Sequence, residues 1–394
     1  MAKPKHAILL WVFLMSVAVY SVAQTTHKQE APSHKRFAHK LGSTFDYGFV
    51  IPTNEYLRGD YEGGEAVSNY WSLSAFFTWQ TQGDKLWHQL YGYPGWGLGL
   101  YHADFGRPDD LGAPWAVFGF YEGPFKRWDK VSVNYHFRVG YSIGWNPFDP
   151  DDTPYQISLG SSKAGYANLR IYLRYKLSPH IELDAGASIT HFSNGATVKP
   201  NKGINMISPT IGLYYQFHPE EQPIARAEIP EYKDNWEWNA VFNFGQKQVA
   251  FDTTNSPKEI DRRYVGVNFN IYGISTTIYK QFTHKSKFGA GIDFLYDESM
   301  NATIDPENGY AVEVSSNLSD KLAIGIFPAY ELVVDKLSFY VQGGYYIIRK
   351  KRYNEIPAFY QRVGMKYHVF KNVSVGINIK AYNMQVADFI EWNL

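Results

Sequence analysis

The chain has 394 residues with 38 Lys+Arg and 38 Asp+Glu, so it lacks the basic excess that nucleic-acid-binding proteins carry. It contains no cysteine, which excludes a disulfide scaffold and a lipid-modified N-terminal cysteine. Aromatic residues make up 17% of the chain, an unusually high share that the strand pattern has to explain.

The first 23 residues are expected to be a cleavable signal peptide. Two lysines in MAKPKH precede the apolar run AILLWVFLMSVAVYSVA, and Ser21 and Ala23 provide the small side chains of a cleavage site. No second apolar run of this length follows, and residues 24–43 are expected to form a mobile leader. An exported, aromatic-rich chain without cysteine is either an outer-membrane β-barrel or a secreted β-sandwich.

Alternation of apolar and polar residues decides between these two classes. In residues 181–193, IELDAGASITHFS, the odd positions from Ile181 to Ile189 are apolar, whereas the even positions include Glu182 and Asp184. Side chains alternate between the two faces of a strand, so each strand has one apolar and one polar face. Residues 167–174, 236–244 and 373–380 repeat the pattern, and Arg170, Arg174 and Lys380 fall on polar faces. Charged inner faces with aromatic strand ends favour an all-β transmembrane antiparallel barrel.

We count about 14 strands, within a range of 12–16, from residue 44 to the end. Residues 44–217 are expected to form one half of a single large barrel, and residues 218–394 are expected to add further strands to it. The charged segment 218–235 would connect the halves, with two smaller barrels as the alternative. Short turns at 177–180 and 370–372 are expected to be periplasmic, and the long connections 81–95 and 145–165 extracellular.

Two polar residues continue the apolar face of the strand at 181–193. Its odd positions end with His191 and Ser193, and Asn205 falls on the same face of the next strand. Cα atoms two residues apart on a strand are ~6.5–7 Å apart, so an imidazole can reach a serine hydroxyl and take its proton. A residue on the neighbouring strand can orient the imidazole, as in a catalytic triad. The alternative is that these side chains occupy the headgroup zone beside an ordinary Asn194-Gly195 turn.

The string HFSNGATVKPNKGIN resembles the active-site signature of the outer-membrane lipid A 3-O-deacylases, the PagL-like acyloxyacyl hydrolase family. The matching positions, with no gap, are His191, Ser193, Asn194, Pro200, Asn201, Gly203 and Ile204. The resemblance implies that Ser193 attacks an acyl ester of lipid A in the outer leaflet while His191 takes and returns the proton. It also implies that Asn194, Gly195 and Asn201 support the oxyanion or the loop. Small members of the family are eight-stranded, so residues 218–394 exceed that plan.

The third catalytic position departs from the family pattern, which has a glutamate where this chain has Asn205. An amide can orient the imidazole but cannot stabilise its positive charge, and in serine proteases the acid-to-amide change costs about 10⁴-fold in rate. The sequence therefore leaves three outcomes: a slow esterase, an esterase with an acid from a distant loop, or an inactive barrel. A pore or hydrophobic-substrate transporter is the further alternative, because about 14 strands would enclose a lumen.

No cofactor and no metal are expected. The twelve histidines show no zinc-binding spacing. The acidic turn with Asp149, Asp151 and Asp152 lacks the pattern of a calcium loop and is better explained as a solvated turn. The expected partners are lipopolysaccharide and membrane lipid, without nucleic acid. The expected location is the outer membrane, where a homodimer is compatible with such a barrel.

Overall fold

A computed structural model gives the structure of residues 37–149, 151–219, 228–252, 264–300, 303–305, 311–313, 317–349, 357–383 and 386–394. The predicted signal peptide and residues 24–36 of the predicted leader lie outside these described residues. The first strand begins at Phe37, so the expectation that the leader extends to residue 43 is wrong.

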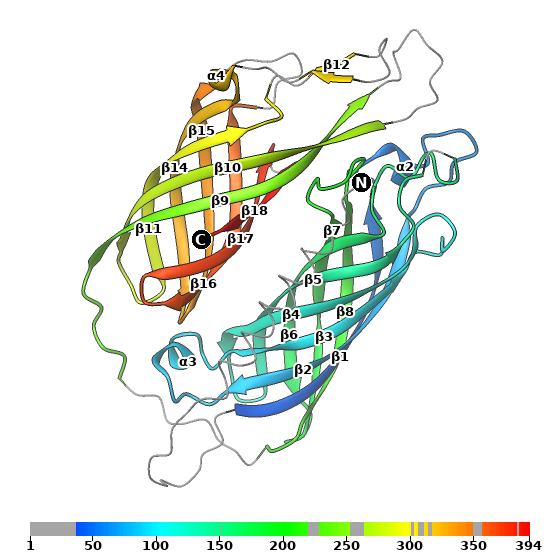
Figure 1. Cartoon of the computed structure of the whole chain (residues 1–394). Helices are drawn as coiled ribbons and strands as arrows, with labels where there is room; N and C mark the ends of the chain where they lie inside the picture. Colours follow the sequence, from blue (N-terminus) through cyan, green and yellow to red (C-terminus); the bar gives the residue numbers. More distant parts are fainter. Residues whose placement is uncertain are drawn as a thin grey trace. The chain divides into compact units, whose positions relative to one another are not determined.

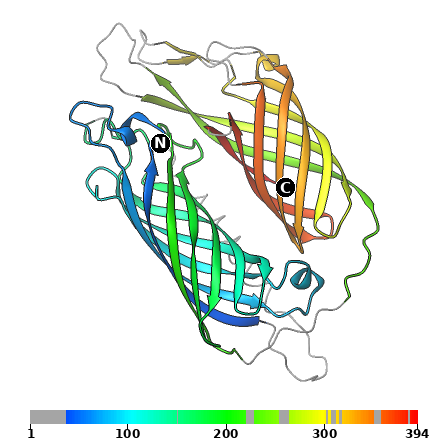
Figure 2. The ribbon, with the colours of Figure 1, turned by 180° about the vertical axis from the view of Figure 1, so that it is seen from behind.

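Residues 37–216 form a closed antiparallel barrel of eight strands, coloured blue to green in Figure 1. Each strand pairs with the next in sequence, and β1 pairs with β8, for example Thr44 opposite Gly212, which closes the sheet (Figure 2). The short helices α2 (Glu55–Arg58) and α3 (Leu86–Leu90) lie in two of its connections. The strands are β1 (Phe37–Ile51), β2 (Asn69–Thr81), β3 (Gly95–Asp104), β4 (Gly112–Arg127), β5 (Val131–Trp145), β6 (Lys163–Lys176), β7 (Ile181–Ser193) and β8 (Ile204–Gln216).

Residues 235–393 form a second closed barrel of eight strands, in which β18 pairs back to β9. A separate two-stranded sheet of β12 (Thr303–Asp305) and β13 (Ala311–Glu313), and helix α4 (Leu318–Lys321), lie in the long connection between two of its strands. The barrel strands are β9 (Asn235–Asp252), β10 (Tyr264–Gln281), β11 (Ser286–Asp297), β14 (Leu322–Val334), β15 (Leu337–Arg349), β16 (Phe359–Phe370), β17 (Val373–Tyr382) and β18 (Val386–Asn393).

The all-β barrel class is confirmed, but the prediction of one large barrel is wrong. The described residues contain 16 barrel strands, within the predicted range, divided equally between two closed barrels. The segment 218–235 therefore separates two barrels, which was the alternative organisation. Alternation in a strand reveals its faces but not its partner, and closure depends on β8 pairing with β1 rather than with β9.

The faces of the strands follow the predicted alternation, with apolar residues outside and charges inside. On β6, Leu169 is 44% exposed, whereas Arg170 is fully buried. In the second barrel, Trp238 is 69% exposed and Lys380 is 1% exposed. This inversion of the usual soluble pattern suits lipid surroundings and a polar interior. Among the described residues, none of the helices is both long and apolar enough to cross a membrane.

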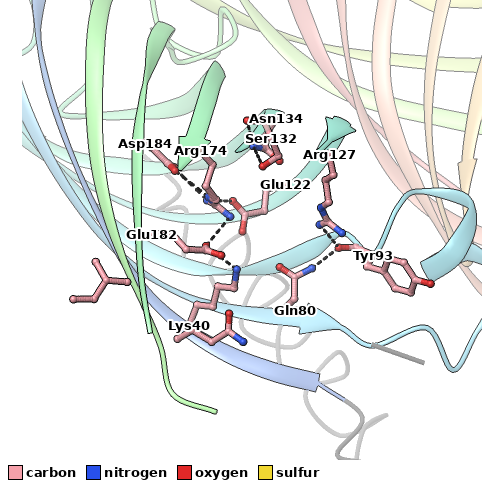
Figure 3. Close-up of polar contacts among 12 residues, drawn as sticks. Lys40, Gln80, Tyr93, Glu122, Arg127, Ser132, Asn134, Arg174, Glu182 and Asp184 are labelled. Atoms are coloured by element: carbon pink, nitrogen blue, oxygen red, sulfur yellow. Dashed lines mark hydrogen bonds and ion pairs between the residues drawn. The ribbon is translucent and has the colours of Figure 1, made fainter. Parts of the chain in front are cut away.

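The interior of the first barrel is filled by side chains, as expected for eight strands. Arg174 Nε lies 2.9 Å from Asp184 Oδ1, and Arg174 Nη2 lies 3.2 Å from Glu122 Oε2 (Figure 3). Lys40 Nζ lies 2.8 Å from Glu182 Oε2 in the same cluster. The inward orientation predicted for Arg174 is confirmed. The strands that the structure describes form two eight-stranded barrels in place of the single wide barrel and lumen expected from about 14 strands.

Antiparallel pairing alternates the connections between the two ends of the first barrel. The turn at 177–180 and the connection 82–94 lie at one end, because they follow β6 and β2. The connections β1–β2, β3–β4, β5–β6 and β7–β8 lie at the other end, which we call the site end. The expectation that 81–95 and 145–165 share one side of the membrane is therefore wrong, since an odd number of strands separates them.

Candidate active site

The site lies at the site end of β7 and β8, on the outer wall of the first barrel. His191 and Ser193 have the outward parity of Ile189, and Asn205 has the outward parity of Ile207. Between the outward pair, Phe192 points inward, is fully buried and packs edge-to-face on Trp145 at a ring distance of 4.8 Å. The polar residues thus lie on the outer face of a sheet whose inner face packs against an aromatic core.

His191 and Asn205 are direct cross-strand partners in the β7–β8 ladder. His191 Nδ1 lies 2.7 Å from Asn205 Oδ1. A carbonyl oxygen can only accept, so Nδ1 carries the proton and Nε2 keeps its lone pair. Within the described part of the chain, no carboxylate forms an ion pair with His191, so the substitute acid considered from the sequence is not found there. Asn205 therefore orients a neutral base without contributing charge.

Ser193 Oγ receives two hydrogen bonds from the loop that follows it. Asn201 Nδ2 donates to Ser193 Oγ at 2.8 Å, and the backbone N–H of Gly195 donates at 3.1 Å. Both bonds use the oxygen as an acceptor, so the hydroxyl proton stays available for donation to a base. Between the described residues, no hydrogen bond joins Ser193 to His191, and such contacts often tighten only in the substrate complex.

Asn194 supports the loop rather than the serine. Its backbone N–H donates to Asn201 Oδ1 at 3.1 Å, and its Nδ2 donates to the carbonyl of Val198 at 2.7 Å. The first bond fixes the orientation of the Asn201 amide. Because Asn201 Oδ1 accepts from the backbone N–H of Asn194, Asn201 Nδ2 is directed toward Ser193. The structure therefore brings together all six residues singled out in the sequence, in two hydrogen-bonded sets. One set is His191 with Asn205, and the other is Ser193 with Gly195, Asn201 and Asn194.

Asn54 and Ser158, which no sequence motif singled out, contact this loop from other connections. Asn54 Nδ2 donates to Ser158 Oγ at 3.1 Å and reaches the carbonyl of Gly203 at 3.5 Å. The only local signal for Asn54 is its place before Glu55-Tyr56-Leu57, which predicts an N-cap but not a contact 149 residues away. Ser158 carries no local signal at all.

The acidic turn is held by its own backbone. Asp149 Oδ1 accepts the N–H groups of Asp151 at 2.8 Å and Asp152 at 3.0 Å, an Asx-type turn. Among the residues that the structure describes, no three His, Cys, Asp or Glu side chains are grouped so that they could hold a metal ion.

The inverted surface and the closed sheets define the class of protein as an outer-membrane β-barrel, here with two barrels in one chain. The family model for lipid A 3-O-deacylase (PagL) matches residues 71–214, and the model for the acyloxyacyl hydrolase C-terminal domain matches residues 236–394. The two matches cover most of the chain and fall on separate barrels. The chain belongs to this PagL-like family of outer-membrane hydrolases, as the resemblance of residues 191–205 indicated.

Two solved structures show low similarity to the chain. Neisserial surface protein A shares 10% identity and a TM-score of 0.29, covering 46% of this chain and 97% of its own. The toluene transporter TodX of Pseudomonas putida shares 10% identity and a TM-score of 0.17, covering 92% of this chain and 88% of its own. A search of curated proteins finds no match.

Proposed function

We propose that the chain is a serine esterase that removes the 3-O-linked acyl chain of lipid A in the outer leaflet. The observation that carries this proposal is the His191–Asn205 pair, which leaves Nε2 of the imidazole unprotonated on the outer wall beside Ser193. The family supplies the substrate class, and the outward parity explains how a lipid would reach the serine without entering the barrel.

The first half of the reaction forms an acyl-enzyme. Ser193 Oγ attacks the ester carbonyl carbon and its proton passes to His191 Nε2. The Asn201 amide and the Gly195 N–H, which now contact Ser193 Oγ, are close enough to donate to the oxyanion that develops beside it. When the intermediate collapses, His191 returns the proton to the sugar 3-oxygen, which leaves as a hydroxyl and ends the first half.

The second half releases the fatty acid. Water attacks the acyl carbonyl on Ser193 while His191 takes one of its protons, and the proton then returns to Ser193 Oγ. Asn205 holds the imidazole in the tautomer that both halves need. Because its amide is neutral, the imidazolium gains no charge stabilisation from it, and the reaction should be slower than with a glutamate.

Mass spectrometry of lipid A from cells expressing the native chain or Ser193→Ala tests the proposal. We expect loss of one hydroxyacyl mass with the native chain only, and the same loss from lipid A treated with purified native protein in detergent. Identical spectra from both proteins, each verified as folded in the outer membrane, would reject the esterase and favour an inactive barrel.

A further inference from the structure

The loop that carries Asn201 is held from outside by two other connections of the site end. The backbone N–H of Gly203 donates to the carbonyl of Ser158 at 2.9 Å, and that of Lys202 donates to the carbonyl of Ile157 at 3.2 Å. Asn54 contacts both Ser158 and Gly203, since its Nδ2 donates to Ser158 Oγ and reaches the Gly203 carbonyl. Three connections, β1–β2, β5–β6 and β7–β8, therefore meet at one buried point.

Burial and bonding make this point well defined. Asn54 is 4% exposed and Ser158 is fully buried. Asn54 Oδ1 accepts the N–H of Leu57 at 3.1 Å as the N-cap of α2, and Gln156 Oε1 accepts the N–H of Ser158 at 2.9 Å. The Asn54 side-chain oxygen is thus bonded to the first turn of α2, which directs the side-chain nitrogen toward the loop.

We call Asn54 and Ser158 the clamp. Close backbone contact explains how the clamp reaches the reacting groups. A Cβ on Gly160 would lie 2.8 Å from the carbonyl carbon of Lys199 and from the oxygen of Pro200, so only glycine lets these two loops touch. At the other end of the segment, Gly203 has a φ of 72°, and a Cβ there would lie 3.1 Å from His191 Cε1. The segment 199–203 is therefore fixed between the β5–β6 connection and the imidazole ring.

We propose that Asn54 and Ser158 are positioning residues for the reaction, an inference that rests on the proposed function. They hold residues 199–203 so that the Asn201 amide meets Ser193 Oγ and the Gly203 backbone supports the His191 ring. Neither residue touches a reacting atom, and both act through the loop. Displacing a catalytic group by about 1 Å can cost about 10²-fold in rate, so loss of the clamp should be visible in kcat.

The test uses full-length variants that separate the clamp from the fold. Asn54→Ser keeps a side-chain oxygen to cap α2 but is too short to reach Ser158 and Gly203, whereas Asn54→Ala loses both functions. Ser158→Ala removes the acceptor. Ser178→Ala is the matched control, because Ser178 Oγ accepts the N–H groups of His180 and Ile181 in the turn at the opposite end.

Three readouts are compared with the native chain: kcat and KM for fatty-acid release, the rate of Ser193 labelling by a fluorophosphonate, and amide hydrogen exchange of residues 199–203. We expect Asn54→Ser and Ser158→Ala to lower kcat and labelling about 10- to 100-fold with a nearly unchanged KM. Exchange at Lys202 and Gly203 should accelerate in both, and Ser178→Ala should match the native chain. Heat-dependent gel migration reports whether each barrel is folded.

The outcomes distinguish the two proposals. Native kinetics and native exchange in both variants would overturn the clamp even when the esterase is active. An inactive native chain whose variants still exchange faster at residues 202–203 would reject the proposed function and the role in the reaction, and would show that Asn54 and Ser158 hold the loop structurally. An inactive native chain with unchanged exchange would reject both.

Discussion

Asn205 Oδ1 accepts a hydrogen bond of 2.7 Å from His191 Nδ1, directly across the β7–β8 ladder. The signature that residues 191–205 resemble has a glutamate at this position, whereas the amide of Asn205 accepts the bond without carrying a charge. Orientation and charge stabilisation, which a carboxylate supplies together, are therefore separated in this chain.

Substitution of Asn205 measures these two contributions. Asn205→Ala removes the acceptor that fixes the tautomer, so kcat should fall at least about tenfold relative to the native chain. Asn205→Glu restores a charge beside the imidazolium and should raise kcat, within the limit of about 10⁴-fold set by the acid-to-amide change in serine proteases. Fatty-acid release by each purified variant gives both values. A glutamate variant slower than the native chain would show that the site has adapted to the neutral amide.

Asn201 should contribute to transition-state stabilisation. Its Nδ2 lies 2.8 Å from Ser193 Oγ, and removing one oxyanion donor typically costs about 10²–10³-fold in kcat. Asn201→Ala should show this loss with little change in KM. Asn201→Asp keeps the oxygen that accepts from Asn194 N but removes the donor, so it should be equally impaired. If Asn201→Asp retained native kcat, Asn201 would be a support for the loop alone.

Gly203→Ala should impair the histidine rather than the fold. The new Cβ would press on His191 Cε1 and would also occupy a left-handed conformation that costs about 1 kcal/mol. Gly63→Ala is a matched control, since Gly63 has a φ of 69° and a Cβ added there would meet no atom within 4 Å. Kinetics should show a lower kcat for Gly203→Ala only. Equal losses in both variants would assign the effect to backbone strain.

Arg174→Ala should destabilise the first barrel without altering the chemistry of the folded molecules. Arg174 is buried among Glu122, Glu182 and Asp184, and removing one partner of a buried ion pair costs about 3–5 kcal/mol. Urea unfolding in lipid vesicles measures the loss. Arg58→Ala, which breaks the exposed pair with Asp60, should change stability by less than about 1 kcal/mol. A native unfolding midpoint for Arg174→Ala would contradict the account of the interior.

Planar-bilayer recordings should be silent. Apart from the ion cluster, Arg138 fills the first barrel by donating to Ser74 Oγ at 3.0 Å and lying 4.9 Å from the ring of Phe118. In the second barrel, Arg362 Nε lies 2.6 Å from Glu391 Oε2 and Lys366 Nζ lies 2.7 Å from Glu331 Oε2. Discrete current steps from folded, purified protein would revive the pore, and a known porin in the same membrane provides the positive control.

Local patterns in the sequence predicted what depends on neighbouring residues. Alternation assigned Leu169 outward and Arg170 inward because side chains of a strand alternate wherever the strand lies. The same rule put His191 and Ser193 on the outer face, and the signature at 191–205 selected the residues that the loop brings together. Closure could not be predicted, because the pairing of Thr44 with Gly212 joins segments with no shared local signal.

The contacts of Asn54 and Ser158 could not be predicted either, because they also join segments distant in sequence. Asn54, Ser158 and Gly203 come from three connections, and their contact exists only after β1 has paired with β8 and β5 with β6. Loop length also wrongly placed the connections 81–95 and 145–165 on one side of the membrane, because the side of a connection depends on the number of strands before it. One strand more or less would reverse it.

The outward orientation of Ser193 on β7 affects how the kinetics should depend on substrate concentration. A reactive group on the outer wall would meet its substrate by lateral diffusion within one leaflet, so the relevant concentration is molecules per unit area of membrane. Apparent KM values in detergent should then scale with the mole fraction of lipid A in the micelle, and adding inert detergent at constant lipid A should slow the reaction by surface dilution. An inhibitor would be ranked by its partitioning into the leaflet as much as by its fit to the serine.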